Sequence, residues 1–401
     1  MQKLPSYVST VLETLETGGY QAYLVGGCVR DLLMGRCPKD FDIATSAMPE
    51  VVIALFSKTI PTGIAHGTVT VLINHAHIEV TTFRRDGDYQ NHRRPEQVTF
   101  VDEVEADLAR RDFTMNAIAM SKTGELIDPF DGRGDIQAKI IRSVGDPCLR
   151  FEEDALRMFR AFRFSAQLGF RIEAETLAAI KTQSVLAQNL SAERVRDETQ
   201  KILCSDRPEI LADVLSYGLL DAYASSVPIN RQAMEEIVHC PDESIVRWCV
   251  FAAILLYSGA IVDAKVFLKS LRLPRRVVEQ GGAAAHLAHS PLMEDTVTLK
   301  NFLAKHFLAI HGEEIVLLAA EASRCLGHPA LLEQVQIIIQ SGECYRTSDL
   351  AIGGNDLLTH GIAQGAEVGE VLQKLLAYVI KNPEKNIKED LLYFLNTYKD
   401  L

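Results

Sequence analysis

The sequence is poor in tryptophan, has no cysteine pair at metal-ligand spacing and has no apolar run long enough to cross a membrane. Its 401 residues include one Trp and eight Cys, and none of the cysteines forms a CxxC pair. This pattern argues against a zinc site and is typical of a reducing compartment. The most apolar stretch, residues 248–262, is interrupted by Ser258 and Gly259. It falls short of the roughly 20 residues of a membrane span, so we expect a buried helix there.

The start of the chain, MQKLPSYVST, is neither basic nor followed by an apolar core. We therefore expect no signal peptide, a cytoplasmic location and no membrane partner. Positive charge is in the minority, with 41 Lys and Arg against 53 Asp and Glu and a net charge of −12. Taken alone, this balance argues against a nucleic-acid partner, so any RNA surface must be a local basic patch. A carboxylate-rich metal site would add to the acidic total.

The length predicts two to four domains at about 100–200 residues each, and 47% apolar residues exclude global disorder. Residues 1–145 have the mixed pattern of an α+β domain with an irregular strand order. The predicted strands cover residues 20–25, 41–43, 68–73 and 78–83, and residues 86–95 form a polar loop. From Phe151 the spacing is helical almost to the end, beginning with one helix over residues 151–168.

Two carboxylates, Asp40 and Asp42, flank Phe41 at the start of a predicted strand. Side chains alternate along a strand, so Asp40 and Asp42 share one face while Phe41 points into the core. The two carboxylates repel each other unless a cation lies between them, and oxygen ligands at this density suit Mg²⁺. A DxD pattern by itself is more often a solvated surface pair.

The segment upstream of this pair, LVGGCVRD (residues 24–31), predicts a strand that enters a helix through a pair of glycines. Glycines such as Gly27 let the backbone approach a ligand, and Arg30 could add a guanidinium fork to a phosphate. The alternative is a tight turn beside a surface arginine. The glycine pair, the arginine and the DxD pattern together favour phosphoryl or nucleotidyl transfer.

The stretch LVGGCVRDLLMGRCPKDFDIAT (24–45) resembles the first motif of the class II tRNA nucleotidyltransferase and bacterial poly(A) polymerase family. Further matches follow in the family's order, densely to about residue 205 and more weakly near the C-terminus. They are IEVTTFR (78–84), DGDYQNHRRP (86–95), DLARRDFTMNAIAM (107–120), DPFDGRGDI (128–136), RFEEDALRMFRAFRFSAQLGF (150–170), SAERVRDE (191–198), DLAIGGNDLL (349–358) and NIKEDLL (386–392).

The resemblance implies a polymerase β-like nucleotidyltransferase head with a mixed sheet, followed by all-helical neck, body and tail domains. We expect the head over 1–145, a neck with a nucleotide-selecting helix over 146–205, a body over 206–335 and a tRNA-binding tail over 336–401. Asp40 and Asp42 would hold two Mg²⁺ ions. Glu79 is the candidate for a third catalytic carboxylate, against the alternative of a surface glutamate, because its alternation puts Val80 on the opposite face.

The resemblance also assigns nucleotide binding to residues of two motifs. Arg111 would contact the nucleotide and Asp112 the ribose hydroxyls, while Asn116 braces the turn and Arg110 forms an ion pair. The loop 86–95, with Tyr89, His92, Arg93 and Arg94, would help to change specificity from C to A, against the alternative of a solvated loop.

In the second motif, Asp154, Arg157, Arg160 and Arg163 recur every three residues along a predicted helix, opposite Leu156, Phe159 and Phe162. An ordinary amphipathic helix with its own ion pairs gives the same pattern. The resemblance instead implies that Asp154 and Arg157 act as a template for the incoming base. Aspartate accepts from the exocyclic amine of C or A, arginine donates to the ring nitrogen, and G and U reverse that order. Arg160 and Arg163 would face the triphosphate or the primer end.

We therefore expect an enzyme that adds CCA to the tRNA 3′ end from CTP and ATP, with Mg²⁺ and without a nucleic-acid template. Within the family, the alternatives are an enzyme that adds only the terminal A and a bacterial poly(A) polymerase. Outside enzymes, the alternative is an inactive tRNA- or RNA-binding protein, which the presence of both Asp40 and Asp42 disfavours.

Overall fold

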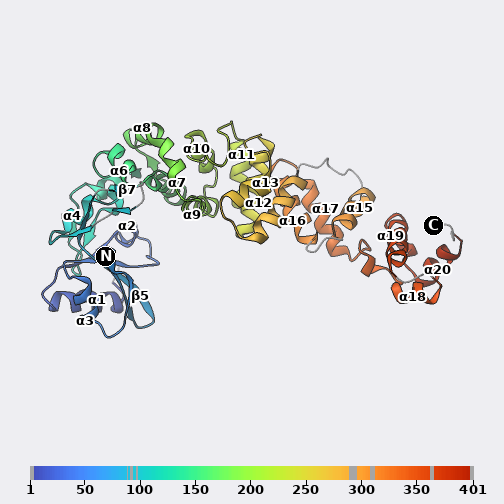
Figure 1. The fold of residues 1–401 in the computed structure, drawn as a ribbon, viewed down its shortest axis with the longest axis horizontal. Helices are drawn as coiled ribbons and strands as arrows, with labels where there is room; N and C mark the ends of the chain where they lie inside the picture. Colours follow the sequence, from blue (N-terminus) through green and yellow to red (C-terminus); the bar gives the residue numbers. More distant parts are fainter. Residues whose placement is uncertain are drawn as a thin grey trace. The chain divides into compact units, whose positions relative to one another are not determined.

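The computed structural model describes residues 4–87, 89–90, 94–95, 98–288, 296–307, 312–361 and 365–397. The chain divides into two compact units, Met1–Ala222 and Tyr223–Leu401. All strands found in the described residues lie in the first unit, and the second is built from helices (Figure 1). The finer division into head, neck, body and tail stays a prediction.

The first unit contains a sheet with the strand order β11-β10-β1-β2-β5-β4-β3. Strands β2 and β5 pair in parallel and the other neighbours are antiparallel, so the predicted mixed sheet is confirmed. The edge strand β3 was not predicted, because its Pro and Gly are typical of a turn; an edge position tolerates both. The strands are β1 (Ala22–Val25), β2 (Asp42–Thr45), β3 (Thr59–Gly63), β4 (Thr68–Ile73), β5 (Ala76–Thr82), β10 (Ala119–Met120) and β11 (Leu126–Ile127).

Helices pack against this sheet and bury its apolar side chains. α1 (Ser6–Thr17) packs on β1, and α3 (Pro49–Leu55) packs on α1, β4 and β5 (Figure 1). A separate cluster joins the sheet to α4 (Val104–Ala109), with buried Phe83 at its centre. The remaining short elements here are α2 (Gly27–Leu33), η1 (Ile64–His66), η2 (Thr114–Asn116) and α5 (Gly132–Ala138).

The polar segment 86–95 is not entirely a loop. Short strands β7 (Tyr89–Gln90) and β8 (Arg94–Pro95) pair antiparallel, and β6 (Arg84–Asp86) pairs with β9 (Val98–Phe100). Part of the polar sequence that predicted a loop therefore belongs to short antiparallel strands. His92 and Arg93 lie outside the described residues.

Helices follow this part of the first unit, and α7 (Leu156–Leu168) packs on α9 (Ala192–Leu203) and α10 (Ile210–Ser216). A parallel pair of two-residue strands ties the helices to the preceding chain. The other elements are β12 (Ile140–Ile141), α6 (Pro147–Glu153), β13 (Arg171–Ile172), α8 (Ala174–Gln183) and η3 (Ser184–Asn189).

The second unit has α12 (Ser244–Tyr257) in its core, which confirms a buried helix within the apolar stretch; the helix ends at Tyr257, and Val262 beyond it is exposed. Trp248 and Phe251 are fully buried in it and pack on Phe267. No helix in the described ranges is long and apolar enough to cross a membrane. The other elements before the C-terminal cluster are α11 (Arg231–Glu235), η4 (Glu236–His239), α13 (Ala264–Ser270), the π-helix η5 (Val277–Gly281), α14 (Gly282–Leu287), α15 (Thr296–Phe307), α16 (Gly312–Cys325) and α17 (Pro329–Ser341).

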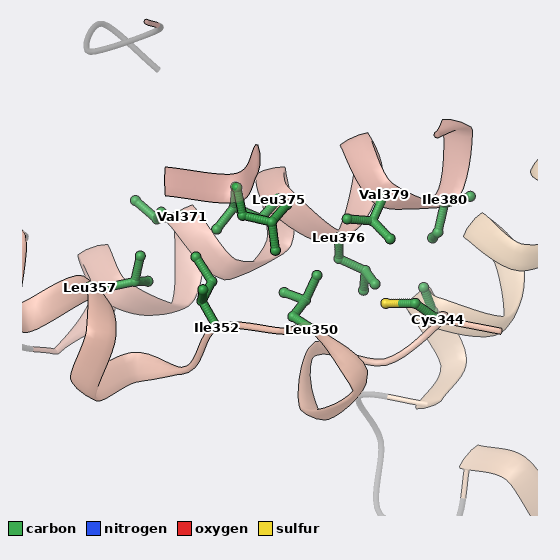
Figure 2. Packing of buried hydrophobic residues seen from close by; sticks show 11 residues of the cluster. Cys344, Leu350, Ile352, Leu357, Val371, Leu375, Leu376, Val379 and Ile380 are labelled. Atoms are coloured by element: carbon green, nitrogen blue, oxygen red, sulfur yellow. The ribbon is translucent and has the colours of Figure 1, made fainter. Parts of the chain in front are cut away.

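The C-terminal part of this unit has its own apolar cluster, in which α19 (Ala366–Lys381) points Leu375 and Leu376 at Leu350 and Ile352 (Figure 2). A 3₁₀ turn and a separate short helix lead into this cluster. The Asp349 carboxylate accepts a hydrogen bond from the Arg346 amide at the turn, and Gly353 precedes the helix. The elements are η6 (Thr347–Asp349), α18 (Gly354–Thr359), η7 (Pro383–Lys385) and α20 (Lys388–Thr397).

Candidate active site

Two carboxylates, Asp42 and Glu79, lie side by side on neighbouring strands. Asp42 is the first residue of β2, and Glu79 is its Cα partner in the parallel pairing with β5. Ile43 and Val80, one position further along each strand, are fully buried, whereas Asp42 and Glu79 are exposed. The predicted alternation of Glu79 and Val80 is therefore confirmed, and both carboxylates share one face of the sheet.

Asp40 is exposed and lies two residues before β2. Between the two aspartates, Phe41 is buried and its ring meets the edge of Tyr7 at a centroid distance of 6.3 Å. The aromatic contact anchors the segment that presents both carboxylates.

The electrostatics around Asp42 leave an excess of negative charge. Loss of hydration around the carboxyl group raises the pKa of Asp42, the charges of Glu79 and Asp40 raise it further, and the Arg111 guanidinium opposes them. A bound cation would relieve this repulsion. No three His, Cys, Asp or Glu side chains in the described part of the chain are arranged to hold a metal by themselves. Mg²⁺ often takes only one or two carboxylates and completes its shell with water and substrate phosphates, which fits two exposed aspartates.

The glycine turn lies directly against these carboxylates. Val25 ends β1 opposite Asp42, and Gly26 follows with a φ of 76°, a backbone conformation that favours glycine. A Cβ atom at Gly26 would lie 3.1 Å from Arg111 Nη1 and 4.0 Å from Asp42 Oδ2. The glycine thus leaves open the narrow space between a carboxylate and a guanidinium, and Gly27 begins α2 beside it.

Arg111 and Arg110 share one buried carboxylate. Asp107 Oδ1 accepts a 2.9 Å hydrogen bond from Arg110 Nε, and Oδ2 accepts a 3.1 Å bond from Arg111 Nη2. Burial alone would raise the pKa of Asp107, but the two guanidinium charges hold it below its ordinary value. The ion pair predicted for Arg110 is confirmed. Arg111 Nε is buried without a hydrogen-bond partner in the described residues, so this guanidinium keeps donor capacity for a ligand.

Asp112 is the centre of a polar network that joins distant parts of the sequence. Its Oδ2 accepts a 2.7 Å hydrogen bond from Arg160 Nε, and its Oδ1 accepts from Asn116 Nδ2 at 3.2 Å and from the Phe113 amide at 2.8 Å. Burial opposes ionisation, but Arg160 and these hydrogen bonds outweigh it and lower the pKa of Asp112 to about 2. Asp112 is therefore a firmly ionised anchor for Arg160, a role in addition to the ribose contact predicted for it.

Arg30 is buried, although the sequence suggested an arginine free to bind phosphate. Its guanidinium donates to Asp31 Oδ1 at 2.7 and 3.0 Å and to Asn116 Oδ1 at 2.9 Å. Asn116 thus braces both Arg30 and Asp112, which confirms the bracing role predicted for it. The nucleotide contact of Arg30 stays a prediction.

The prediction of one continuous helix over 151–168 is wrong, because the helix is interrupted at Asp154, between α6 and α7. Asp154 Oδ1 accepts a 3.1 Å hydrogen bond from the Leu156 amide, and Oδ2 accepts a 2.8 Å bond from Arg194 Nη2. A short carboxylate that bonds to the backbone two residues ahead competes with a continuous helix. Asp154 therefore lies at the entrance to α7 and is held there by Arg194 of α9.

Arg157 lies one turn further on and is buried. Its Nη1 donates to Glu153 Oε2 at 2.6 Å and to the Arg150 carbonyl at 3.1 Å, and its Nη2 donates to the Arg110 carbonyl at 2.9 Å. A guanidinium has five N–H donors, so donor capacity remains for a base edge. Asp154 and Arg157 therefore lie at the same end of α7, and their role as a base template stays a prediction.

The arginines of α7 do not form the solvated face of an ordinary amphipathic helix. Leu156, Phe159 and Phe162 are buried as predicted, but Arg157 and Arg163 are buried too. Arg160 and Arg163 pair with Asp112 and with Glu198 of α9, not with residues of their own helix.

Three family models match successive parts of the chain. The Poly A polymerase head domain matches residues 22–142, the "Probable RNA and SrmB- binding site of polymerase A" matches 169–224, and tRNA nucleotidyltransferase domain 2 matches 242–395. Enzymes with such a head generally use divalent metal ions.

Curated relatives match nearly the whole chain. The CCA-adding enzyme of Geobacillus kaustophilus is 39% identical over 96% of this chain and 95% of its own length. That of Lactobacillus delbrueckii subsp. bulgaricus is 38% identical over 96% of each chain. The chain belongs to the family of CCA-adding enzymes. It is therefore an enzyme, a tRNA nucleotidyltransferase, as the sequence motifs predicted.

Solved structures of other CCA-adding enzymes share the fold. The Bacillus stearothermophilus CCA-adding enzyme in complex with CTP aligns with a TM-score of 0.77 and 32% identity over 100% of both chains. The Thermotoga maritima CCA-adding enzyme complexed with tRNA_CCA aligns with a TM-score of 0.71 and 21% identity over 99% of this chain and 97% of its own. The predicted α+β head with following helices is thus confirmed as the fold of this family member.

One residue that the sequence analysis missed is Phe164. Its ring lies against Arg30, Arg160 and Arg163 at 4.2–5.4 Å from the guanidinium carbons. An apolar residue within an arginine-rich helix gives no chemical signal. Phe164 follows Arg160 by four residues and therefore lies on the same helix face, and this spacing was the signal by which a contact between the two side chains could have been predicted.

Proposed function

We propose that this chain extends the 3′ end of tRNA with CCA, taking C from CTP and A from ATP, by Mg²⁺-dependent nucleotidyl transfer without a nucleic-acid template. The observation that carries the mechanism is the register pairing of Asp42 with Glu79, next to Asp40 and the Gly26 turn. The CCA-adding relatives along the whole chain, and the neighbours solved with CTP and tRNA, support this substrate class. The cytoplasmic location belongs to the same proposal.

Asp40 and Asp42 would hold the Mg²⁺ ions. When bound, these ions would lower the pKa of the primer hydroxyl and offset the charge of the departing pyrophosphate. The exposed carboxylates and the raised pKa of Asp42 support this assignment, because a cation relieves the repulsion between them. Glu79, on the next strand, is the proposed third carboxylate.

The reaction joins the tRNA 3′ oxygen to the α-phosphorus of the nucleotide. The bond from that phosphorus to the bridging oxygen breaks, pyrophosphate leaves and the hydroxyl proton goes to solvent. Arg111 is proposed to bind the triphosphate, because its buried Nε has no protein partner in the described residues and its Nη1 lies beside the bare backbone of Gly26. Asp112 and Arg160 act as one ionised pair at the nucleotide.

Asp154 and Arg157 are proposed to select the base. The Asp154 carboxylate has lone pairs beyond its two hydrogen bonds for the exocyclic amine of C or A, and Arg157 has N–H groups for the ring nitrogen. G and U present the reverse order and would leave buried polar groups unpaired. Such mismatches allow discrimination of ~10⁴.

An extension assay with each nucleotide supplied alone and together tests the proposal. Wild-type protein should add CC from CTP to tRNA lacking CCA, and A only after CC is present. Asp42→Ala should abolish incorporation while tRNA binding persists. Asp197→Ala, which removes an exposed carboxylate on α9, serves as the control and should keep activity.

Two outcomes contradict parts of this proposal. Use of ATP alone on tRNA ending in CC, with no use of CTP, would indicate an A-adding enzyme. Full activity of Asp42→Ala would reject the metal assignment.

A further inference from the structure

The ring of Phe164 has an unusual set of neighbours, because three guanidinium groups contact one buried aromatic side chain. The Arg163 guanidinium carbon lies 4.2 Å from the ring centroid, that of Arg30 lies 5.3 Å away and that of Arg160 lies 5.4 Å away. The edge of the same ring meets Phe113 at a centroid distance of 5.8 Å and an interplanar angle of 88°. Phe164 is 6% exposed, so the ring itself is shielded from water.

Two of these arginines are also linked by a chain of hydrogen bonds. Arg30 donates to Asn116, Asn116 donates to Asp112, and Arg160 donates to Asp112. Because Arg30 and Arg160 also both contact the Phe164 ring, these two arginines are connected in two ways: through Asn116 and Asp112, and through the ring. Arg30 belongs to α2 next to the glycine turn, and Arg160 and Phe164 belong to α7. The ring therefore joins the turn beside the carboxylates to the helix proposed to select the base.

The ring also compensates for the crowding of positive charge. Burial and the charges of Arg160 and Arg30 lower the pKa of Arg163, the charges of Glu198 and Asp112 oppose them, and together these effects place it at about 10. The carboxylate partner of Arg163 is loosely placed. Arg163 Nε and Glu198 Oε2 are 3.2 Å apart, but neither atom has a hydrogen-bond partner in the described residues, and the hydrogen bond from Nη1 to Oε1 is 3.5 Å long. The negative face of an aromatic ring attracts desolvated cations, so Phe164 supplies attraction that the carboxylate does not fully provide.

We propose that Phe164 is a positioning residue for nucleotide binding, which holds Arg30 and Arg160 at the spacing at which they meet the triphosphate. This inference rests on the proposed function. Phe164 itself does not contact the nucleotide; it acts through the two arginines. A loss of the ring should therefore weaken binding of CTP and ATP alike, since both carry the same triphosphate, and should leave the chemical step nearly unchanged.

The test compares Phe164→Leu with Phe162→Leu and Phe164→Tyr. Phe162 is a matched control, because it is buried on the same helix and its ring packs on Tyr217 at 5.5 Å. We expect Phe164→Leu to raise KM for CTP and ATP about tenfold, the effect of one desolvated cation–π contact, with kcat within about threefold of wild type. Phe162→Leu should leave KM unchanged, and Phe164→Tyr, which keeps the ring, should restore it.

Circular dichroism melts of all variants separate positioning from stability. A KM that stays at the wild-type value in Phe164→Leu would overturn the positioning role, as would an equal rise in Phe162→Leu or a failure of Phe164→Tyr to restore KM. These outcomes leave the proposed function standing, provided that wild-type protein incorporates CTP and ATP. If wild-type protein incorporates neither, the proposed function is rejected and the role of Phe164 with it.

Discussion

The ionised Asp112 should contribute measurably to the stability of the first unit. Its pKa is lowered from 3.8 to about 2, because Arg160 and two hydrogen-bond donors outweigh the penalty of burial. At about 1.4 kcal/mol per pKa unit, this difference corresponds to about 2–3 kcal/mol in favour of the ionised folded state. Asp112→Asn keeps the shape and removes the charge, so it should lower the free energy of unfolding at pH 7 by about that amount.

The pH dependence of this effect has a definite sign. A carboxylate whose pKa is depressed on folding stabilises the protein above its unfolded pKa, and this stability is lost as the pH falls toward the folded value. The difference between wild type and Asp112→Asn should be constant from pH 7 to about pH 5. It should shrink below about pH 4 and approach zero near pH 2.

The single tryptophan provides an internal control for the measurement. Trp248 is fully buried in the second unit, so its fluorescence during urea unfolding reports on that unit, whereas circular dichroism reports on both. Asp112→Asn should shift the dichroism transition of the first unit and leave the fluorescence midpoint unchanged. The control variant Asp197→Asn removes the charge of an exposed carboxylate that pairs with its neighbour Arg196. It should change the free energy of unfolding obtained from either signal by no more than about 1 kcal/mol. An unchanged dichroism transition at pH 7 would refute the reasoning.

Two further substitutions test the carboxylate edge of the sheet. Glu79→Gln should lower kcat by at least about tenfold without changing the melting temperature, because it removes the charge beside Asp42 and preserves the strand; full activity would exclude Glu79 from the reaction. Gly26→Ala and Gly19→Ala both place alanine at a positive φ, but only a Cβ at Gly26 would approach Arg111. Each should cost about 1–2 kcal/mol of stability, and only Gly26→Ala should also raise KM for the nucleotides; equal KM values would contradict the role given to Arg111.

The sequence predicted well those features that depend on local periodicity. Strand β4 has the predicted bounds, and the alternation around Glu79 placed its carboxylate on the face of Asp42. Such features depend on the spacing of two along a strand, which neighbouring residues determine. The break at Asp154 was missed because the residues on both sides are good helix formers, and only the hydrogen bond to the Leu156 amide reveals the competing cap.

Partners far apart in the sequence could not be predicted from periodicity. The regular arginine spacing in α7 suits a solvated face, yet Arg160 pairs with Asp112 and Arg163 with Glu198, 48 and 35 residues away. Burial of an arginine is stable only when charges and donors on other elements meet it, and no local pattern encodes that meeting. The sequence motifs indicated that the arginines of α7 belong to one site, but only the three-dimensional structure shows which carboxylate each arginine pairs with.

The ion pairs of Asp112, Asp154 and Arg111 are relevant to two requirements of the proposed site, which must discriminate between bases and also bind and release nucleotides. Asp112 and Asp154 are each held by an arginine of a helix, Arg160 of α7 and Arg194 of α9, so these two carboxylates of the proposed site are fixed before any ligand arrives. In the described residues, Arg111 donates a hydrogen bond to one carboxylate, that of Asp107, which it shares with Arg110, and its buried Nε has no protein partner. Fixed groups favour selection, because a mismatched base cannot induce them to move. A cation held by a shared carboxylate can exchange that partner for a triphosphate at low cost, so in the proposed site the fixed carboxylates would serve selection and Arg111 would be free to move toward the triphosphate.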